Sequence, residues 1–498
     1  MKIALVTPRN SSENSRSFYD YNFYSSFLFS KKYISYLLAI PTLASLTPPH
    51  HEIRVFDENI EKIDYSWDAN LVGISVRTMF AKKAYAISQK YRDLGVKTVL
   101  GGIHPSMCPD EALSHCDSVV IGEAEDVWAE LLKDAEEGHL KKCYKSGSYS
   151  DLSRSPAIYR KNLSRNMYFQ DILQTTKGCP FHCEFCSVYA FDGQKNRHKT
   201  VDQVIQEIFD INSTGSKYKS KKAILIADDN IIANRKFARE LFMAMKPHNI
   251  NWMCQSSIDI SKEEELLVLM RDSGCGAIFI GFESISVDNL KAMHKDVNQR
   301  FDYVEAIGKI QSYGMLVHSS FIVGYDYDSE KTFKELITFI DKTNLLMPLI
   351  NILTPFPGTE LFSRLEKEGR IIHKNWNKYD TQNVVFSPRY QTPEELAAGF
   401  RRIVKDVYSF DSIWKKLNYY WDIDFWKRSN ELDPVKFRYR ILFALRLGTM
   451  LFSSNIERSR FIIKLLPRIF NKRMRISSIL TLMAYNDFAA HLGDTPDQ

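Results

Sequence analysis

Three cysteines close together are the strongest chemical signal in this sequence. The segment KGCPFHCEFC at positions 177–186 spaces Cys179, Cys183 and Cys186 as CxxxCxxC, directly after an expected strand. Three thiolates in a short loop can bind three irons of a cubane cluster and leave the fourth iron open to a substrate or cofactor. Zinc, with His182 as a fourth ligand, and a purely structural cysteine group are the alternatives. The chain has no distant CxxC or HxxxH to complete a zinc site.

The residues before this loop alternate short apolar runs with helical patterns. We expect strands at 2–7, 52–56, 71–75, 98–100 and 118–121, with helices at 81–94 and 126–137 between them. Such alternation predicts a parallel, doubly wound sheet, in which ligands bind beyond the carboxyl ends of the strands. The Gly and Pro residues at those ends could equally serve only as turns.

A second strand–helix series follows a serine-rich stretch. We expect a first unit over 1–145, a linker over 146–170, a second unit over 171–390 and a helical region over 391–498. Six strands at 172–176, 223–227, 252–255, 277–281, 317–321 and 349–353 predict a partial (β/α)6 barrel.

Composition excludes several classes of protein. The 498 residues are 44% hydrophobic and 25% charged, as in an ordinary globular chain. A net charge of +6 does not suggest a nucleic-acid binder, and eight cysteines are too few for a disulfide scaffold. The basic excess is uneven, because residues 401–498 hold 18 Lys+Arg and 10 Asp+Glu. Without a signal peptide or a long apolar run, we expect a cytoplasmic protein.

The cysteine spacing, with a strand before it and five after it, resembles the radical S-adenosylmethionine (SAM) superfamily. Phe185 matches the aromatic residue that this family carries before the last cysteine. The resemblance implies a [4Fe-4S] cluster whose open iron binds SAM, and whose electron cleaves SAM to a 5′-deoxyadenosyl radical. Each polar residue at a later strand end could instead cap a helix. The resemblance implies SAM contacts by Phe185, Asp228, Asp229, Gln255, Ser256, Glu283, Ile322 and Gly324.

A doubly wound unit before such a barrel resembles the cobalamin-binding domain of one radical SAM subfamily. The motifs GGIHP at 101–105 and GEAE at 122–125 carry this resemblance, since small residues let a flat macrocycle approach the backbone. The chain lacks DxHxxG, so no histidine of that motif is available below the cobalt, where Arg77 or Thr78 would be neighbours. The implied cobalamin site comprises Pro8, Ser75, Arg77, Thr78, Gly101, Gly102, Ile103, His104, Gly122 and Glu123.

This subfamily usually transfers a methyl group to an unactivated carbon, with one SAM as methyl source and a second as radical source. The resemblance therefore implies a cobalamin-dependent methyltransferase with a small-molecule or lipid-like substrate and an electron donor such as flavodoxin or ferredoxin. Radical cyclisation or rearrangement is one alternative, and a cluster-bearing scaffold or sensor without turnover is another. Basic amphipathic helices expected at 438–452 and 460–475 could lie on an anionic membrane or cover the barrel.

Overall fold

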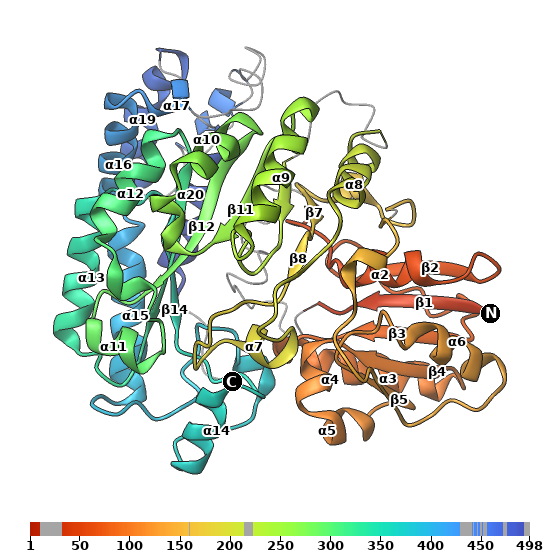
Figure 1. Cartoon of the computed structure of the whole chain (residues 1–498). Coiled ribbons are helices and arrows are strands. Elements are labelled where there is room, and N and C mark those ends of the chain that lie inside the picture. The colour runs from red at the N-terminus through yellow and green to blue at the C-terminus, as the bar shows by residue number, and fades with distance from the viewer. Residues whose placement is uncertain are drawn as a thin grey trace.

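Two parallel sheets and a set of C-terminal helices make up the molecule (Figure 1). The computed structural model describes residues 1–9, 32–158, 160–213, 223–428, 441, 443–445, 447–448, 451, 456–471 and 476–492. No helix of these described residues is both long enough and apolar enough to cross a bilayer.

The first sheet is a six-stranded parallel sheet with the order β2-β1-β3-β4-β5-β6. Its strands are β1 (Lys2–Thr7), β2 (Glu52–Asp57), β3 (Leu71–Ser75), β4 (Lys97–Gly101), β5 (Ser118–Ile121) and β6 (Cys143–Lys145). All five expected strands are present, and the predicted doubly wound fold is confirmed. The sequence did not predict β6, because three residues are too few to give a periodic signal.

Helices cover both faces of this sheet. One face carries α2 (Ala39–Leu46) and α6 (Trp128–Glu136), and the other carries η1 (Thr78–Phe80), α3 (Ala81–Asp93), α4 (Ile103–Met107) and α5 (Pro109–Leu113). Each face has its own buried core, with Trp128 in one and Tyr91 in the other. This two-sided burial explains why the central strands read as continuous apolar runs.

The second sheet is also parallel, with the order β14-β13-β12-β11-β10-β7. Its strands are β7 (Asp171–Leu173), β10 (Ile224–Ile226), β11 (Trp252–Ser256), β12 (Cys275–Glu283), β13 (Leu316–Val323) and β14 (Leu349–Ile352). Along its outer side run α8 (Val201–Ser213), α9 (Arg235–Met245), α10 (Glu264–Asp272), α11 (Val287–Ala292), α12 (Tyr303–Ser312) and α13 (Glu330–Thr343). Since β7 and β14 are edges that do not pair, the barrel is open, and the predicted partial barrel is confirmed.

Short elements join these parts. They are the two-stranded pair β8 (Thr176–Lys177) and β9 (Arg197–His198), the helix α7 (Ser187–Phe191), and the 3-10 turns η2 (Leu152–Arg154), η3 (Arg165–Met167), η4 (Lys246–His248), η5 (Ile258–Lys262), η6 (Asn298–Arg300) and η7 (Trp376–Lys378). The expected linker is packed, because the fully buried Arg160 guanidinium forms a 2.9 Å ion pair with Glu207 of α8. The proposed domain limits stay a prediction.

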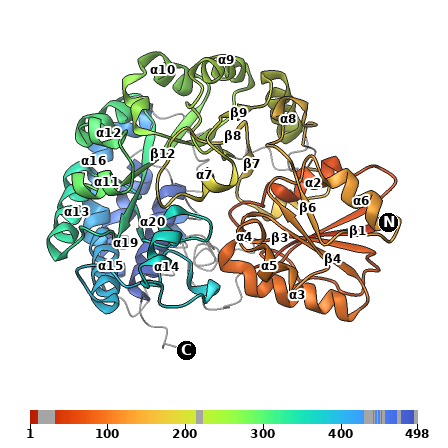
Figure 2. The same ribbon diagram turned by 60° about the horizontal axis from the view of Figure 1, so that its bottom comes forward.

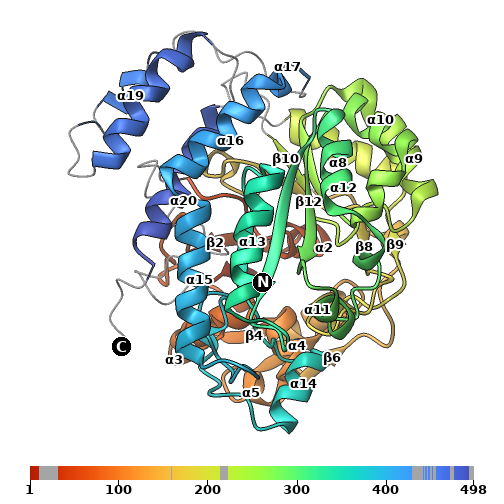
Figure 3. The ribbon, with the colours of Figure 1, turned by 90° about the vertical axis from the view of Figure 1, so that its left-hand side faces the viewer.

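The C-terminal part is helical, as predicted. Within the predicted region 391–498 the helices are α15 (Pro393–Val407), α16 (Phe410–Asp422), α17 (Phe425–Arg428), α19 (Ile456–Asn471) and α20 (Ile476–Ala490), and α14 (Glu360–Lys367) precedes this region. Figure 3 shows α15 beside α13 and α19 at the outer edge of this layer. The segment around α14 crosses back to the first sheet, where Phe362, Trp376 and Tyr379 join the core that contains Tyr91 (Figure 2). The basic helix expected at 438–452 lies mostly outside the described residues.

Candidate active site

The cysteine loop lies between the two sheets, where α7 marks its end (Figures 1 and 2). Antiparallel β8 and β9 close its base, and the Cys179 N–H donates to the Gly193 carbonyl at 3.2 Å. Gly178 has a φ of +85°, and a Cβ there would lie 2.5 Å from the Lys195 carbonyl oxygen. Only glycine therefore lets the chain enter this loop.

The three thiols lie within electrostatic range of one another. Burial raises the pKa of all three, and that of Cys186 to about 11. The Lys295 ammonium opposes this effect at each of Cys179, Cys183 and Cys186. His182, the alternative zinc ligand, has its Nε2 2.9 Å from Glu360 Oε1 and its ring against Tyr189.

Lys295 was not singled out in the sequence, although it faces the whole cysteine cluster. Its Nζ donates to Glu283 Oε1 at 3.2 Å. Burial disfavours the ammonium and would lower the pKa of Lys295, but Glu283 and the thiols outweigh burial and raise this pKa. Glu283 ends β12 at a register shift and has a φ of +62°, a strained conformation for a non-glycine residue. No local pattern distinguishes Lys295 from a solvent-exposed lysine after a helix.

The two adjacent aspartates after β10 have different surroundings. Asp228 is fully engaged, since it accepts from the Thr175 N–H at 2.6 Å, the Thr176 N–H at 3.0 Å and the Thr175 hydroxyl at 2.5 Å. Its carboxylate therefore fixes the Thr175–Thr176 segment that leads into the cysteine loop. Asp229 accepts from the Gly178 N–H at 3.2 Å, and burial, with the nearby Asp192 carboxylate, raises the pKa of Asp229 to about 7.

The remaining predicted SAM contacts lie toward the strand ends of the second sheet or, for Phe185, in the cysteine loop. Gln255 Nε2 donates to the Asp229 carbonyl at 3.1 Å, whereas the buried Ser256 hydroxyl donates to the Ser257 carbonyl at 3.2 Å. The Gly324 N–H is taken by Asp328 Oδ2 at 2.7 Å. Half-buried Phe185 and Ile322 pack against the core of the second unit.

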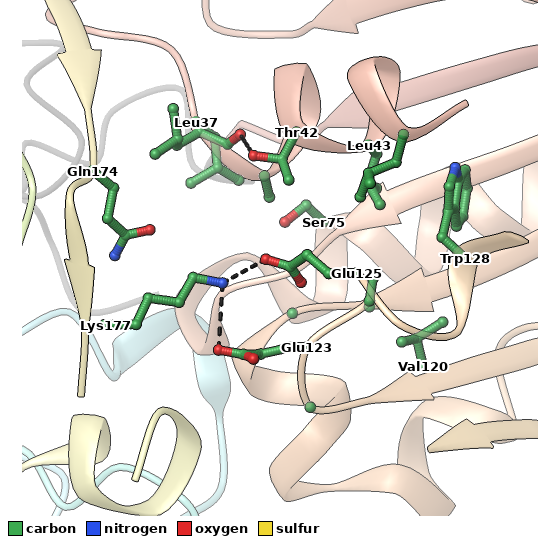
Figure 4. A pocket seen from close by; sticks show the side chains of 18 of the residues that line it. Leu37, Thr42, Leu43, Ser75, Val120, Glu123, Glu125, Trp128, Gln174 and Lys177 are labelled. Atoms are coloured by element: carbon green, nitrogen blue, oxygen red, sulfur yellow. Dashed lines mark hydrogen bonds and ion pairs between the residues drawn. The ribbon is translucent and has the colours of Figure 1, made fainter. Parts of the chain in front are cut away.

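A cavity of about 400 Å³ opens at the carboxyl end of the first sheet (Figure 4). It is lined by seven of the ten predicted cobalamin residues, namely Ser75, Arg77, Gly101, Gly102, Ile103, Gly122 and Glu123. Pro8, Thr78 and His104 are not among its lining residues. His104 is fully buried and directs Nε2 to the Tyr85 hydroxyl at 3.0 Å, because α4 turns this side chain into the core.

The cavity continues under α2, which sequence reasoning did not assign to the site. Leu38, Thr42 and Leu43 form its roof, and its floor reaches Gly73 and Val99 in the middle of the strands. The sequence carries a short apolar run around Pro41 at this place, which is too short to indicate a membrane span and does not by itself indicate a ligand site. A deep apolar cavity with glycine at its floor and mouth fits a flat macrocycle with a long side arm, and thus fits cobalamin.

Charged residues join the two units at the mouth of this cavity. Lys177 Nζ lies 2.6 Å from Glu125 and 3.4 Å from Glu123, between the two carboxylates drawn in Figure 4. Arg197 forms two 2.8 Å hydrogen bonds to Glu123. Burial alone would raise the pKa of Glu123, but Arg197 and Lys177 together lower it. Glu123, predicted as a cobalamin contact, is thus also the main ion-pair partner across the units.

Three family models match successive parts of the chain. A B12 binding domain model matches residues 46–132, and a radical SAM superfamily model matches residues 173–340. A domain of unknown function (DUF4070) matches residues 359–493. The fold and the site therefore define a protein with a B12-binding domain followed by a radical SAM domain.

Curated relatives narrow the class further. The chain is 32% identical over 404 residues to bacteriochlorophyllide d C-12(1)-methyltransferase of Chlorobaculum tepidum, covering 79% of this chain and 88% of that protein. It is 29% identical over 394 residues to hopanoid C-2 methylase of Rhodopseudomonas palustris, covering 76% and 72% of the two chains. The chain belongs to the cobalamin-dependent radical SAM methyltransferase family.

A solved structure shares the whole architecture. The cobalamin-dependent SAM radical enzyme OxsB, solved with aqua-cobalamin and SAM bound, matches with a TM-score of 0.63 at 15% identity, over 100% of this chain and 82% of that chain. At this identity the match establishes the fold. The fold and the family membership together identify the protein as a class B radical SAM methyltransferase. It uses a [4Fe-4S] cluster, SAM and cobalamin, and it acts on a small molecule.

Proposed function

We propose that this enzyme methylates an unactivated carbon of a large, hydrophobic, lipid-like substrate at the boundary between its two sheets. The observation that carries this proposal is that one residue borders both cofactor sites. Lys177 lines the cobalamin cavity and stands two residues before Cys179, so the two cofactor sites are neighbours along the chain and in space. Relatives named for bacteriochlorophyllide d and hopanoids support a large, mostly apolar substrate.

The cluster and SAM sites use the residues around the cysteine loop. Cys179, Cys183 and Cys186 would hold the cluster, and when bound, the cluster with SAM supplies the 5′-deoxyadenosyl radical and cobalamin carries the methyl group. Asp229, whose carboxylate faces the loop, would accept from the SAM ammonium. Lys295 would bind the SAM carboxylate, and Glu283 Oε1, 3.2 Å from Lys295 Nζ, holds the lysine side chain in place. Asp228 supports the loop from behind.

The proposed SAM contacts also include the other strand-end residues, and the proposed cobalamin contacts are those that line the cavity. Phe185, Gln255, Ser256, Ile322 and Gly324 would contact SAM beside the cluster. Around cobalamin, glycines 101, 102 and 122 would leave room for the macrocycle, and the exposed Arg77 at the cavity would contact it. Thr42 and the apolar residues of α2 would cover the side arm.

Product analysis under anaerobic, reducing conditions tests the reaction. Bacteriochlorophyllide d and a hopanoid serve as probe substrates, with flavodoxin or ferredoxin as the proposed electron donor from the reducing cytoplasm. A methyltransferase should form both S-adenosylhomocysteine and 5′-deoxyadenosine, and the product should gain one CH2 unit by mass. Formation of 5′-deoxyadenosine alone with either probe would instead support a cyclase or rearrangement.

A lipid-like substrate also favours contact with a membrane surface. On α19, Ile456 and Ile463 are 67% and 60% exposed, and the basic Arg460 and Lys464 are exposed on the same helix. Apolar and basic side chains on one helix favour an anionic bilayer. Sedimentation with vesicles that contain phosphatidylglycerol, at low salt, should bring down the protein. Ile463→Asp should weaken this binding, and equal binding to purely zwitterionic vesicles would contradict the proposal.

A further inference from the structure

Glu184 is a buried carboxylate inside the cysteine loop, and neither the expected chemistry nor the family comparison gives it a role. It lies between Cys183 and Cys186, and its side chain is 8% exposed. A buried charge is costly unless it is paired and hydrogen-bonded. Glu184 is fully provided with partners: the Tyr325 hydroxyl donates to Oε2, and Arg364 donates from Nε at 2.5 Å and from Nη2 at 3.2 Å.

The backbone of Glu184 is also held from two sides. Its N–H donates to the Met293 carbonyl at 3.1 Å, and its carbonyl accepts from the Leu361 N–H at 3.0 Å. A single residue of the loop is therefore tied to the end of α11, to α14 and to the segment after β13. These contacts span up to 180 residues of sequence, as in the pair of Glu184 with Arg364.

Arg364 continues a chain of alternating charges away from the loop. Its Nη1 donates to Asp326 Oδ2 at 2.8 Å, and Asp326 Oδ1 accepts from Arg370 Nη2 at 2.9 Å. Each carboxylate thus has a guanidinium partner, so the Glu184 charge is balanced next to the cysteines. Because every charged group of this partly buried network has a partner, the network should hold one geometry.

The helix that carries Arg364 also touches the first unit. Phe362 of α14 packs into the core that contains Tyr85 and Tyr91. Just before the helix, a Cβ on Gly358 would lie 2.1 Å from the Met107 sulfur of α4. Hence α14 contacts the cobalamin-binding unit and, through Arg364, the cysteine loop.

We propose that Glu184 and Arg364 form a positioning pair for the [4Fe-4S] cluster. The pair sets both the orientation of the Cys183–Cys186 turn and the net charge beside the cluster. The inference rests on the proposed ligand set of Cys179, Cys183 and Cys186. A negative charge near a cluster stabilises its oxidised form and lowers its reduction potential, and a positive charge raises the potential. The pair keeps these two effects in balance.

Potentiometric titration of the reconstituted full-length protein, followed by electron paramagnetic resonance, tests the pair. Glu184→Gln removes a negative charge and should shift the cluster's midpoint potential upward. Arg364→Met leaves the carboxylate unbalanced and should shift the potential downward. The double variant should return close to the wild-type potential, and Arg364→Lys, which keeps the charge, should shift it least. Loss of packing alone would not produce shifts of opposite sign.

The control is a fully buried Arg–Glu pair outside the cysteine loop, Arg160 with Glu207, whose side chains are both 0% exposed and 2.9 Å apart. Arg160→Met and Glu207→Gln should leave the potential unchanged even where they lower the melting temperature. Shifts of the same sign in both Glu184 and Arg364 variants, or shifts no larger than those of the control pair, would overturn the inference. A wild-type protein without a cluster signal would instead refute the proposed ligands. If Arg364→Met fails to fold, an upward shift in Glu184→Gln with little shift in Arg364→Lys still supports the inference, and no upward shift in Glu184→Gln overturns it.

Discussion

Both parallel sheets bind a cofactor at the carboxyl edge of their strands, but they do so with different kinds of residues. At the carboxyl edge of the first sheet, glycines 101, 102 and 122 and an apolar roof surround a deep cavity. At the edge of the second sheet, buried charges and the strained Glu283 surround the cysteine loop. A large, flat cofactor needs space, whereas a small zwitterion beside a metal cluster needs fixed charges. Strand order alone therefore says where a ligand binds, and the side chains at the edge say which ligand.

The same contrast should decide which substitutions affect which cofactor. The two edges meet at Lys177 with its partner Glu123, and at Asp192, which lines the cavity and also helps to raise the pKa of Asp229. The three cysteines and Lys295 are not among the residues that line the cavity. We therefore expect changes at one edge to spare the other cofactor.

The largest effect should come from the cysteines. Replacing Cys179, Cys183 and Cys186 by Ala should abolish the cluster and all product formation, because no ligands remain for iron. Iron and sulfide analysis with absorption spectroscopy measures the loss. Cobalamin binding should persist in the same protein, and its disappearance would show that the two edges are not separate. Cys143→Ala, at an exposed cysteine of β6, is the control.

A change at the first edge should have the converse effect. Gly101→Leu places a side chain at the lining of the cavity. The nearest atom to the added Cβ would be the Cβ of Val120, at 3.6 Å. Overfilling a site typically costs ~1–3 kcal/mol, so cobalamin binding should weaken by about 100-fold with the cluster intact. Gly147→Leu, where no atom lies within 4 Å of the added Cβ, serves as control. Equal loss of cobalamin and cluster would contradict the comparison.

Within the second edge, Lys295 should matter for SAM more than for folding. Lys295→Met removes the ammonium but keeps the length of the side chain, so SAM affinity should fall by about 30-fold, as for loss of a charge-assisted hydrogen bond. Equilibrium binding of SAM to the cluster-loaded protein measures this effect. Lys309→Met removes an ammonium from an exposed pair with Glu264 and should leave the affinity unchanged. Unaltered SAM binding in Lys295→Met would remove this residue from the site.

The smallest effect should be a pH dependence. Burial, with Asp192 nearby, raises the pKa of Asp229 to about 7, so this carboxyl is largely protonated at pH 6 and ionised at pH 8. Only the carboxylate attracts the SAM ammonium, and SAM affinity should therefore rise with pH, by up to about tenfold over this range. Asp229→Asn should flatten the profile. A rise of the same size in this variant would assign the pH dependence to another group.

The strands of both sheets and the cysteine motif are local features, and the sequence predicts them well. The buried strands read as apolar runs, and CxxxCxxC lies within eight residues. Strand β6 was missed because it is short. The roof of the cavity was missed because α2 covers the cavity only after it packs against the sheet. The burial of His104 against Tyr85 could not be read from the sequence, because a motif does not say which way a side chain turns.

The sequence by itself determined the two parallel sheets, the order of the cofactor units and the cysteine loop, since each depends on patterns a few residues long. Only the tertiary structure decided which charges face that loop. Lys295 reaches the cysteines from beyond α11, and Glu184 finds Arg364 180 residues away. Such pairs leave no periodic trace, because a partner brought close by folding has no fixed spacing in the chain. Electrostatics at this site is therefore a property of the packed fold, built on a motif that the sequence already displays.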